Sequence, residues 1–507
     1  MADWSSGYVS EIDYTHGYYS ELCPGRAQTA VLTAGYKAPA LTRICELGCG
    51  QGFSSNLHAA ANPGIEFHAT DFNPGQIANA RALAADAGTH NVTFYDTAFA
   101  DFAEEPGLPD QFDVIALHGI YSWISPENRQ AIIDFIAEKL AIGGLVYISY
   151  NALPGWAAAM PLRRLMVDHA ARSNGPILPR IGEALDFADK MAGQAKYFTA
   201  NPVLKERLEK LKGQSRHYLA HEYFNRDWTP FYFADVAADM AEAKLSFVGS
   251  AHIVDQIDAI NLTKDQQALL SAEPDRIRRE GLKDFIINQQ FRRDVYIKGP
   301  QKHDLLSVRD AWSATRFALS IGRDDVPMKV TGALGEADLQ PDVYTPLLDA
   351  LANGPASVDQ MMRADKKIAD LGWPRLMQAM AILSGSGNVH PCLPANGEAD
   401  RAARTRAFNA AVCARAKTST SLNYLASPVT GGGIPVDRFG QLFLGCRQAD
   451  EPDPVASVWS LLKLQNQRVV KDGKPLQSEA ETVTELKQRL AEFEENRLPV
   501  LMKLGIA

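Results

Sequence analysis

Residues 44–52 read ICELGCGQG, an apolar run that is suited to a buried strand and leads into three glycines. Glycines in this position let the chain turn from strand into helix and let its backbone approach a ligand closely. Gly48, Gly50 and Gly52 form the pattern G-x-G-x-G, whereas a dinucleotide-binding fold has its third glycine one residue later, as G-x-G-x-x-G. The stretch therefore predicts an α/β fold that holds a nucleotide cofactor other than a dinucleotide.

Two carboxylates specify the cofactor further. Glu46 precedes the first glycine by two residues, where it would repel a diphosphate but could hold the ammonium group of a nucleoside that carries an amino acid. Asp71 closes the apolar run at 65–70 and is placed to accept hydrogen bonds from both ribose hydroxyls. These features favour S-adenosyl-L-methionine. A glycine-rich turn without a ligand is the alternative, and Asp71 makes it the weaker interpretation.

The domain organisation follows from the periodicity of the apolar residues. Apolar runs lie at 43–47, 65–70, 91–95, 112–117 and 144–150 and alternate with helical stretches, which is typical of a parallel sheet covered on both faces. We therefore expect a Rossmann-like α/β domain over residues 1–156, of which 1–37 form an N-terminal lid segment. A mainly helical middle domain is expected at 157–299 and a C-terminal α+β domain at 300–507, with a winged-helix-like part around 340–395.

Size and composition restrict the class of protein. The chain has 507 residues, too many for one core, and the usual domain size suggests about three domains. Its formal net charge of −9 argues against nucleic acid as a general partner. The six cysteines include no C-x-x-C pair, so neither disulfides nor a structural metal are expected. The N-terminus lacks a basic segment with an apolar core, which predicts a cytoplasmic protein without a membrane partner.

Chemistry is expected where the fourth strand ends, in the sequence HGIYSW at 118–123. Ligands of an open α/β sheet bind beyond the carboxyl ends of its strands, so this tip should line the place where a methyl group is delivered. Tyr121 and Trp123 could attract a cationic acceptor through their rings, or could be ordinary core residues. His118, with an unperturbed pKa of about 6.5, could be the base. The alternative is a structural histidine whose backbone carbonyl holds the amino group of the cofactor.

Aromatic residues elsewhere are candidates for the cofactor site. The segment Tyr14–Tyr19 is dense in aromatic rings and hydroxyls, which indicates either a lid that excludes water or packing against the edge of the sheet. Ala98 stands where an adenine-binding carboxylate is expected, so adenine recognition is assigned to backbone groups near Phe99. The predicted cofactor-binding residues are Glu46, Gly48, Gly50, Gly52, Asp71, Phe72, Phe99, His118 and Tyr18, and the predicted catalytic residues are His118, Tyr121 and Trp123.

Several longer strings resemble one family. They are ELGCGQG at 46–52, ATDFNP at 69–74, HGIYSW at 118–123, SYNALPGW at 149–156, HEYFN at 221–225, FRRDV at 291–295 and YLASPVTGGG at 424–433. Together they resemble the bacterial class I methyltransferases with a methyltransferase regulatory domain, which include the rickettsial outer-membrane-protein lysine methyltransferases. The resemblance implies that Glu46, Gly48, Gly50 and Asp71 contact S-adenosyl-L-methionine. It also implies that the middle and C-terminal domains help to receive a protein substrate.

Three functional hypotheses follow. The leading one is an S-adenosylmethionine-dependent methyltransferase that modifies lysine side chains of a protein, and a homodimer is compatible with it. The second is N- or O-methylation of a small molecule, with the helical domain as a cap over the pocket. The third is a non-catalytic protein that binds the cofactor and regulates a partner. A mostly apolar, enclosed cavity would favour the small molecule, whereas an open acidic groove leading to His118 would favour a polypeptide lysine.

Overall fold

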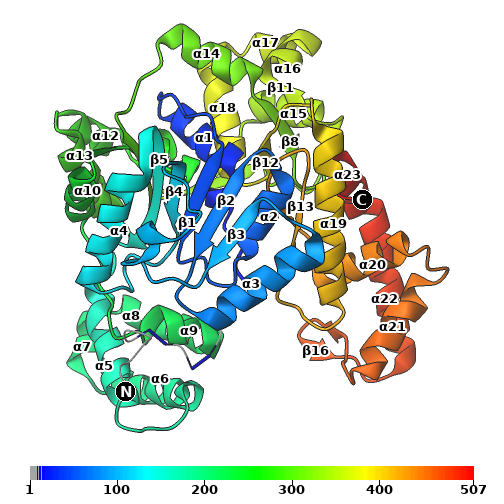
Figure 1. Cartoon of the computed structure of the whole chain (residues 1–507), viewed down its shortest axis with the longest axis horizontal. Helices are drawn as coiled ribbons and strands as arrows, with labels where there is room; N and C mark the ends of the chain where they lie inside the picture. Colours follow the sequence, from blue (N-terminus) through cyan, green and yellow to red (C-terminus); the bar gives the residue numbers. More distant parts are fainter. Residues whose placement is uncertain (1–7, 10, 13) are drawn as a thin grey trace.

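The computed structural model describes residues 8, 9, 11, 12 and 14–507. Among these residues seven strands form one central sheet, in the order β3-β2-β1-β4-β5-β7-β6 (Figure 1). The strands are β1 (Arg43–Leu47), β2 (Glu66–Thr70), β3 (Val92–Tyr95), β4 (Phe112–Leu117), β5 (Leu140–Asn151), β6 (Leu245–Ser250) and β7 (Phe291–Lys298). Strands β1 to β5 are parallel and lie where the sequence predicts strands, which confirms the α/β, Rossmann-like fold.

The last two strands of the sheet come from the segment that was expected to be mainly helical. β7 pairs antiparallel with β5, from Leu145 opposite Ile297 to Asn151 opposite Phe291, and β6 pairs antiparallel with β7. Helices predominate in 157–299, as expected. The segment also supplies β6 and β7 to the central sheet, which was not expected. Short apolar runs buried on both faces cannot be told from helical segments by periodicity, which is why these two strands escaped prediction.

Helices cover both faces of the sheet. They are α1 (Pro24–Thr33), α2 (Phe53–Ala61), α3 (Pro74–Ala87), α4 (Pro126–Lys139) and α10 (Phe233–Glu242). On one face Val31 and Ala59, from α1 and α2, pack against Ile44 of β1. On the other face Phe135 and Phe233 belong to a core that α4 and α10 build over β1 and β4. Each such large buried side chain contributes about 1.5–3 kcal/mol of hydrophobic stabilisation.

A group of five helices follows β5 and lies below the sheet in the view of Figure 1. It consists of α5 (Met160–Ala170), α6 (Ile177–Ala192), α7 (Lys196–Ala200), α8 (Val203–Lys212) and α9 (Arg216–Tyr223). These helices share a core of their own, against which Val9 and Ile12 of the N-terminal segment also pack. Between β6 and β7 the chain forms α11 (Asp258–Asn261), α12 (Lys264–Ser271) and α13 (Arg276–Ile287).

A smaller α+β unit begins after β7. Its described strands form a three-stranded sheet, β8 (Arg316–Leu319) between β11 (Ala356–Ser357) and β12 (Val389–Cys392), and a hairpin of β9 (Lys329–Gly332) and β10 (Gly335–Asp338). Its helices are α14 (Leu305–Ala314), α15 (Pro341–Ala352), α16 (Val358–Ala364), α17 (Lys366–Ala369) and α18 (Trp373–Gly385). The helices and the extended piece expected around 340–395 are present, while the likeness to a winged helix stays a prediction.

The C-terminal part packs against the cofactor-binding half of the chain. Helix α19 (Glu398–Ala416) runs beside α2 and α3 (Figure 1), and Phe408 and Val412 share a core with Phe53 and Leu57. The remaining elements are β13 (Tyr424–Ala426), β14 (Gly433–Pro435), α20 (Arg438–Gln448), α21 (Pro454–Leu464), β15 (Val470–Lys471), β16 (Lys474–Pro475), α22 (Glu479–Glu492) and α23 (Leu498–Lys503). Of the helices in the described part of the chain, none combines the length and apolar character needed to cross a membrane.

Candidate active site

The glycine turn connects β1 to α2. Gly48, Gly50 and Gly52 all have positive φ angles, of 72°, 54° and 64°. Side chains of L-residues rarely tolerate this region, so the turn requires glycine at these positions. The N–H groups of Gly48 and Cys49 both donate to the carbonyl of Thr70, at 2.8 and 3.0 Å. The turn is therefore fixed against the end of β2, next to Asp71.

Asp71 is buried directly beside the turn. Its two carboxylate oxygens accept hydrogen bonds from the backbone N–H groups of Gly50 and Asn73, each at 3.0 Å. Burial raises the pKa of Asp71 to about 6, although these two hydrogen bonds favour the charged form. Asn73 in turn caps α3 by accepting from two backbone N–H groups of its first turn. The carboxylate is thus held in one orientation at the carboxyl ends of β1 and β2.

A cavity of about 680 Å³, which we call the cofactor cavity, opens beside this carboxylate. Of the predicted cofactor residues, Gly48, Gly50, Asp71, Phe72, Phe99 and His118 line it. The glycines leave the wall open, because a Cβ atom at Gly50 would point between Tyr14 and Gln76, 3.5 and 3.7 Å away. The cavity therefore suits a nucleoside whose ribose faces Asp71.

Two of the predicted cofactor residues lie behind the turn rather than on the cavity wall. Glu46 is buried and accepts a hydrogen bond from the hydroxyl of Ser55, and burial raises its pKa to about 7. A Cβ atom at Gly52 would lie 2.6 Å from the side chain of Ala80, so this glycine serves the packing of α2 on α3. Neither residue lines the cofactor cavity, so a contact of Glu46 or Gly52 with the cofactor stays a prediction.

Tyr18, another predicted cofactor residue, does not line the cofactor cavity. Its hydroxyl accepts a hydrogen bond from the N–H of Gly433 at 2.7 Å, and its ring lies 4.5 Å from that of Tyr424. It therefore faces the C-terminal part of the chain. The neighbouring Tyr19 lines the cofactor cavity instead. The two rings lie on opposite sides because successive side chains of an extended segment point in opposite directions.

Described residues of the segment that was expected to be a lid line the cofactor cavity. The side-chain amide of Gln51 donates to the carbonyl of Tyr14 at 3.3 Å, and the N–H of Tyr19 donates to the hydroxyl of Ser54 at 3.0 Å. Both contacts attach the segment to the beginning of α2. Burial raises the pKa of Tyr19 to about 12, so its hydroxyl stays neutral. Residues 1–7, 10 and 13 of the expected lid lie outside the described residues.

His118 lies at the tip of β4 and is enclosed by aromatic rings. The ring of Tyr19 stacks on it with 3.7 Å between centroids, and its Nδ1 is 2.9 Å from the hydroxyl of Tyr147. Burial lowers the pKa of His118 to about 4. A base of this strength cannot hold the proton of an alkylammonium group, whose pKa is about 10.4. Of the two interpretations of this histidine, the environment favours the structural one.

The two aromatic residues of the same tip have different positions. Trp123 lines the cofactor cavity and also the neighbouring cavity described below. Tyr121 is fully buried, and its hydroxyl donates to a carboxylate oxygen of Asp239 in α10 at 2.7 Å. The expectation that Tyr121 is catalytic is corrected, because this hydrogen bond and the core around it turn the ring away from both cavities.

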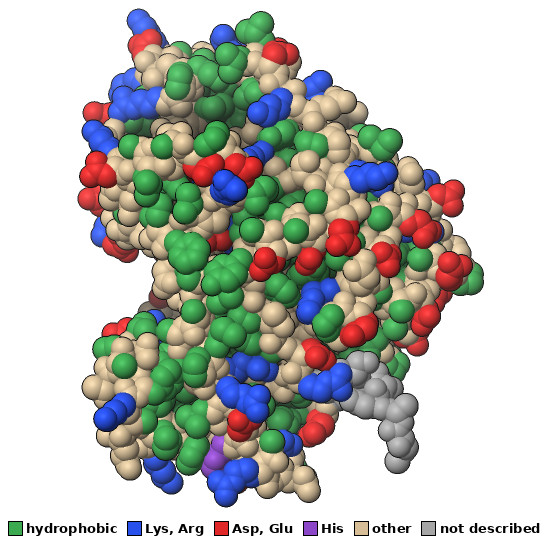
Figure 2. Space-filling model, turned by 90° about the vertical axis from the view of Figure 1, so that its left-hand side faces the viewer, with side chains coloured by type: hydrophobic (Ala, Val, Ile, Leu, Met, Phe, Trp, Pro, Cys, Tyr) green, Lys and Arg blue, Asp and Glu red, His purple; other side chains and the backbone are tan. Residues whose placement is uncertain are grey.

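A second, larger cavity adjoins the first, and we call it the acceptor cavity. It has a volume of 1910 Å³ including its open mouth, and its walls come from α8 and α9 on one side and from the start of β7 on the other. Figure 2 shows a hollow between these two parts of the molecule. Six residues line both cavities, namely Tyr14, Thr15, Gly17, Tyr19, His118 and Trp123. The cavities are thus separated by one layer of mainly aromatic side chains.

Glu222, on α9, is a residue of the acceptor cavity that the sequence reasoning missed. Burial alone raises its pKa to about 8, because no described residue lies close enough to stabilise its charged form. It follows no strand and belongs to no spacing pattern, so periodicity offered no signal for it. The string HEYFN, which carries part of the family resemblance, is the one feature that includes it.

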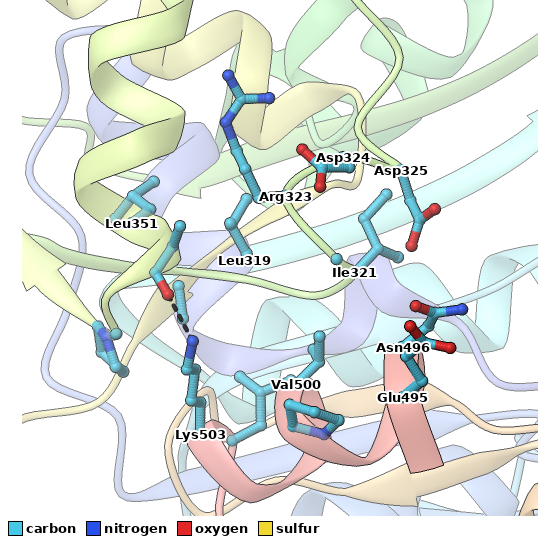
Figure 3. Close-up of a pocket in the computed structure, with 17 residues that line it drawn as sticks. Leu319, Ile321, Arg323, Asp324, Asp325, Leu351, Glu495, Asn496, Val500 and Lys503 are labelled. Atoms are coloured by element: carbon cyan, nitrogen blue, oxygen red, sulfur yellow. Dashed lines mark hydrogen bonds between the residues drawn. The ribbon is translucent and has the colours of Figure 1, made fainter. Parts of the chain in front are cut away.

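Another cavity lies far from the glycine turn, between the smaller α+β unit and α23 (Figure 3). It has a volume of about 820 Å³ and contains the charged residues Arg323, Asp325 and Lys503. The cations at this cavity already have partners: Arg323 pairs with Asp349, and Lys503 donates to the carbonyl of Ala352 at 2.6 Å. None of the residues of the glycine turn reaches it, so it is separate from the candidate active site.

Comparisons with known proteins identify the family of the chain. A family model described as a methyltransferase domain matches residues 45–146, and one described as a predicted methyltransferase regulatory domain matches 215–298. An uncharacterized protein of Synechocystis is 45% identical over 99% of this chain and 100% of its own length. The chain belongs to the family of methyltransferases with a methyltransferase regulatory domain.

More distant similarity concerns the fold and the cofactor. The structure of PKMT2 from Rickettsia typhi in complex with AdoHcy superposes with a TM-score of 0.70, at 19% identity, over 97% of this chain and 100% of that one. A malonyl-[acyl-carrier protein] O-methyltransferase of Bacillus cereus is 28% identical over 24% of this chain and 41% of its own. As a methyltransferase of this family, the protein uses S-adenosylmethionine, which supplies a methyl group on a sulfonium. Gly48, Gly50 and Asp71 line the cavity in which we expect its nucleoside.

Proposed function

We propose that this methyltransferase modifies lysine side chains of a protein. The observation that carries the proposal is the acceptor cavity. It is open to solvent at its mouth, and charged as well as apolar side chains line it. A folded partner can insert one long side chain, or a short segment, into such a space. The resemblance to rickettsial lysine methyltransferases and the fold shared with PKMT2 support the same assignment.

The junction of the two cavities suits a lysine amine. Methyl transfer from a sulfonium requires that the acceptor lone pair lie in line with the S–CH₃ bond, so positioning supplies much of the rate enhancement. Trp123, Tyr14 and Tyr19 form the wall through which the amine would approach, and aromatic faces attract a cationic amine. The same rings exclude water from the reacting groups.

A small-molecule acceptor is the second candidate function. The Bacillus cereus O-methyltransferase is a methyltransferase relative, but the similarity covers only 24% of this chain. The acceptor cavity is also lined by charged side chains, including Glu206, Arg207 and Lys210, rather than by apolar ones alone. A mixed wall of this kind favours a polypeptide.

The experiment is incubation of the protein with S-adenosylmethionine labelled in its methyl group and with a fractionated lysate of the source cells. We expect label in protein, at lysine residues identified by mass spectrometry of the labelled bands. The variant Asp71→Asn, which weakens the cofactor cavity, serves as the control for label transferred by other enzymes. Label that appears only in small molecules would contradict the protein-lysine assignment.

A further inference from the structure

We propose that Glu222 receives the acceptor amine: its carboxylate binds the lysine ammonium in the acceptor cavity and takes up the proton that the amine must lose before methyl transfer. This inference rests on the proposed function and names the group that acts on the acceptor. His118 had been the candidate base, but its neutral, aromatic surroundings remove it from that role.

The position of Glu222 is the first argument. It lies in the last turn of α9 and lines the acceptor cavity together with Tyr218 and Tyr223 of the same helix. The N-terminal segment faces it from the opposite side. Burial raises the pKa of Tyr14, and repulsion between Glu222 and the phenolate of Tyr14 adds to this rise. Because Tyr14 lines both cavities, Glu222 lies close to the layer of side chains that separates them.

The charge of its surroundings is the second argument. The other ionisable side chains that line the acceptor cavity are Tyr14, Tyr19, Tyr218, Tyr223, Glu206, Arg207, Lys210 and His118. The tyrosines and His118 are neutral near pH 7, because burial raises the pKa of the former and lowers that of the latter. Arg207 is engaged, since its guanidinium lies 3.9 Å from the ring centroid of Trp156 and donates to the hydroxyl of Tyr223. A carboxylate without a cationic partner among the described residues is therefore available to an incoming ammonium group.

The proposed steps balance in protons and electrons. The ammonium group of lysine transfers one proton to the Glu222 carboxylate, which leaves a neutral amine and a neutral carboxylic acid. The lone pair of the amine nitrogen then forms a bond to the methyl carbon of S-adenosylmethionine while the C–S bond breaks, and its electron pair goes to sulfur. The product is an N-methylammonium group and a neutral thioether. Glu222 returns its proton to water at the open mouth of the cavity.

The test uses n-butylamine, which has the length of a lysine side chain, as a probe of the full-length protein saturated with S-adenosylhomocysteine. Binding is followed by NMR titration of the amine signals between pH 6.5 and 9. A carboxyl group with a pKa of about 8 is roughly 3% ionised at pH 6.5 and about 90% ionised at pH 9. We therefore expect the affinity of the wild-type protein to rise about 30-fold over this range.

Variants distinguish the contribution of Glu222 to amine binding from that of the other residues of the acceptor cavity. Glu222→Gln should bind the amine at least tenfold more weakly at pH 9 and lose the rise with pH, whereas Glu222→Asp should keep the rise at lower affinity. The matched control is Glu206→Gln, which removes an exposed carboxylate from the same cavity and should behave as wild type. Each variant is first checked for an unchanged circular dichroism spectrum.

Two results would overturn the inference: no detectable binding of n-butylamine by the wild-type protein, or equal binding by wild type and Glu222→Gln. Failure of the proposed function is a different result. If the labelling experiment places methyl groups only in small amines, the protein substrate is wrong while the amine-binding role of Glu222 stands. If proteins are labelled equally by wild type and Glu222→Gln, the protein substrate stands and the role of Glu222 is wrong.

Discussion

Replacing Asp71 by asparagine should weaken cofactor binding strongly while leaving the chain folded. The carboxylate is 8% exposed and accepts from the N–H groups of Gly50 and Asn73, each at 3.0 Å. Asparagine has one acceptor oxygen and one N–H₂ donor, so one of these backbone groups loses its acceptor and faces another donor. An unsatisfied buried donor costs about 1–3 kcal/mol. Loss of a charged acceptor for the ribose hydroxyls adds about 1.5–3 kcal/mol.

The unsatisfied backbone donor already destabilises the free protein, so only part of the penalty affects binding. We therefore expect the binding free energy to weaken by roughly 1.4–2.8 kcal/mol, which lowers the affinity about 10- to 100-fold. The assay is calorimetric titration of S-adenosylhomocysteine at pH 7.5. The control is Asp96→Asn, because Asp96 is half exposed, follows the next strand and pairs with Arg81 at the surface. Affinity of Asp71→Asn within threefold of wild type would refute the proposed role of this carboxylate.

The same site predicts a pH dependence. Burial raises the pKa of Asp71 to about 6 from its ordinary 3.8, so the ionised form is disfavoured in the folded protein. Its contribution to stability is therefore complete below pH 3.8 and is lost as pH rises through 6. The affinity for the cofactor depends on pH in the opposite direction to the stability: it rises with pH, because the ribose hydroxyls need the ionised carboxylate as acceptor. The ionised fraction rises from about 9% at pH 5 to about 97% at pH 7.5, so wild-type affinity should rise about tenfold and that of Asp71→Asn should not.

Three further substitutions test separate positions. Trp123→Leu keeps an apolar side chain but removes the π face, so kcat/KM for a lysine acceptor should fall about 3- to 30-fold, while calorimetry should find S-adenosylhomocysteine affinity within twofold of wild type. Tyr121→Phe removes the hydrogen bond to Asp239 and should cost about 1 kcal/mol in urea unfolding without altering turnover; a large loss of turnover would restore its catalytic role. Gly52→Ala places a Cβ 2.6 Å from Ala80 at a φ of 64°, and should lower thermal stability by about 1–3 kcal/mol; an unchanged Tm would contradict the packing argument.

The sequence was a good guide where the structure is determined by neighbours along the chain. The glycine turn, the strand that precedes it and the position of Asp71 all follow from spacing over fewer than thirty residues. The same local reasoning failed by one or two positions at Tyr18 and Tyr121. Tyr18 and Tyr19 are neighbours in an extended segment, where the direction of the side chains alternates. Tyr121 lies in a turn instead, and its hydrogen bond to Asp239 holds it in the core. Tyr19 and Trp123 occupy the cavity walls instead.

Glu222 could not be predicted for a different reason. It lies 151 residues after Asp71 in the sequence, and it reaches the acceptor cavity only because the chain that leaves β5 folds back beneath the sheet. The spacing of apolar residues along the chain does not show that distant segments come together in this way. Its raised pKa is likewise a property of burial, which becomes visible only when α8, α9 and the N-terminal segment are assembled around it.

The arrangement also explains what the regulatory segment contributes. Residues 215–298, which match the regulatory-domain family model, contain α9 with Glu222 and both antiparallel strands of the central sheet. β7 pairs with β5 along seven consecutive residues, and β5 carries the end of the cofactor-binding half of the chain. Separating the regulatory segment from β5 would break the hydrogen bonds between β5 and β7 and expose the core between these two parts of the chain. The regulatory segment is therefore part of the same folding unit as the glycine turn, and it supplies one wall of the acceptor cavity.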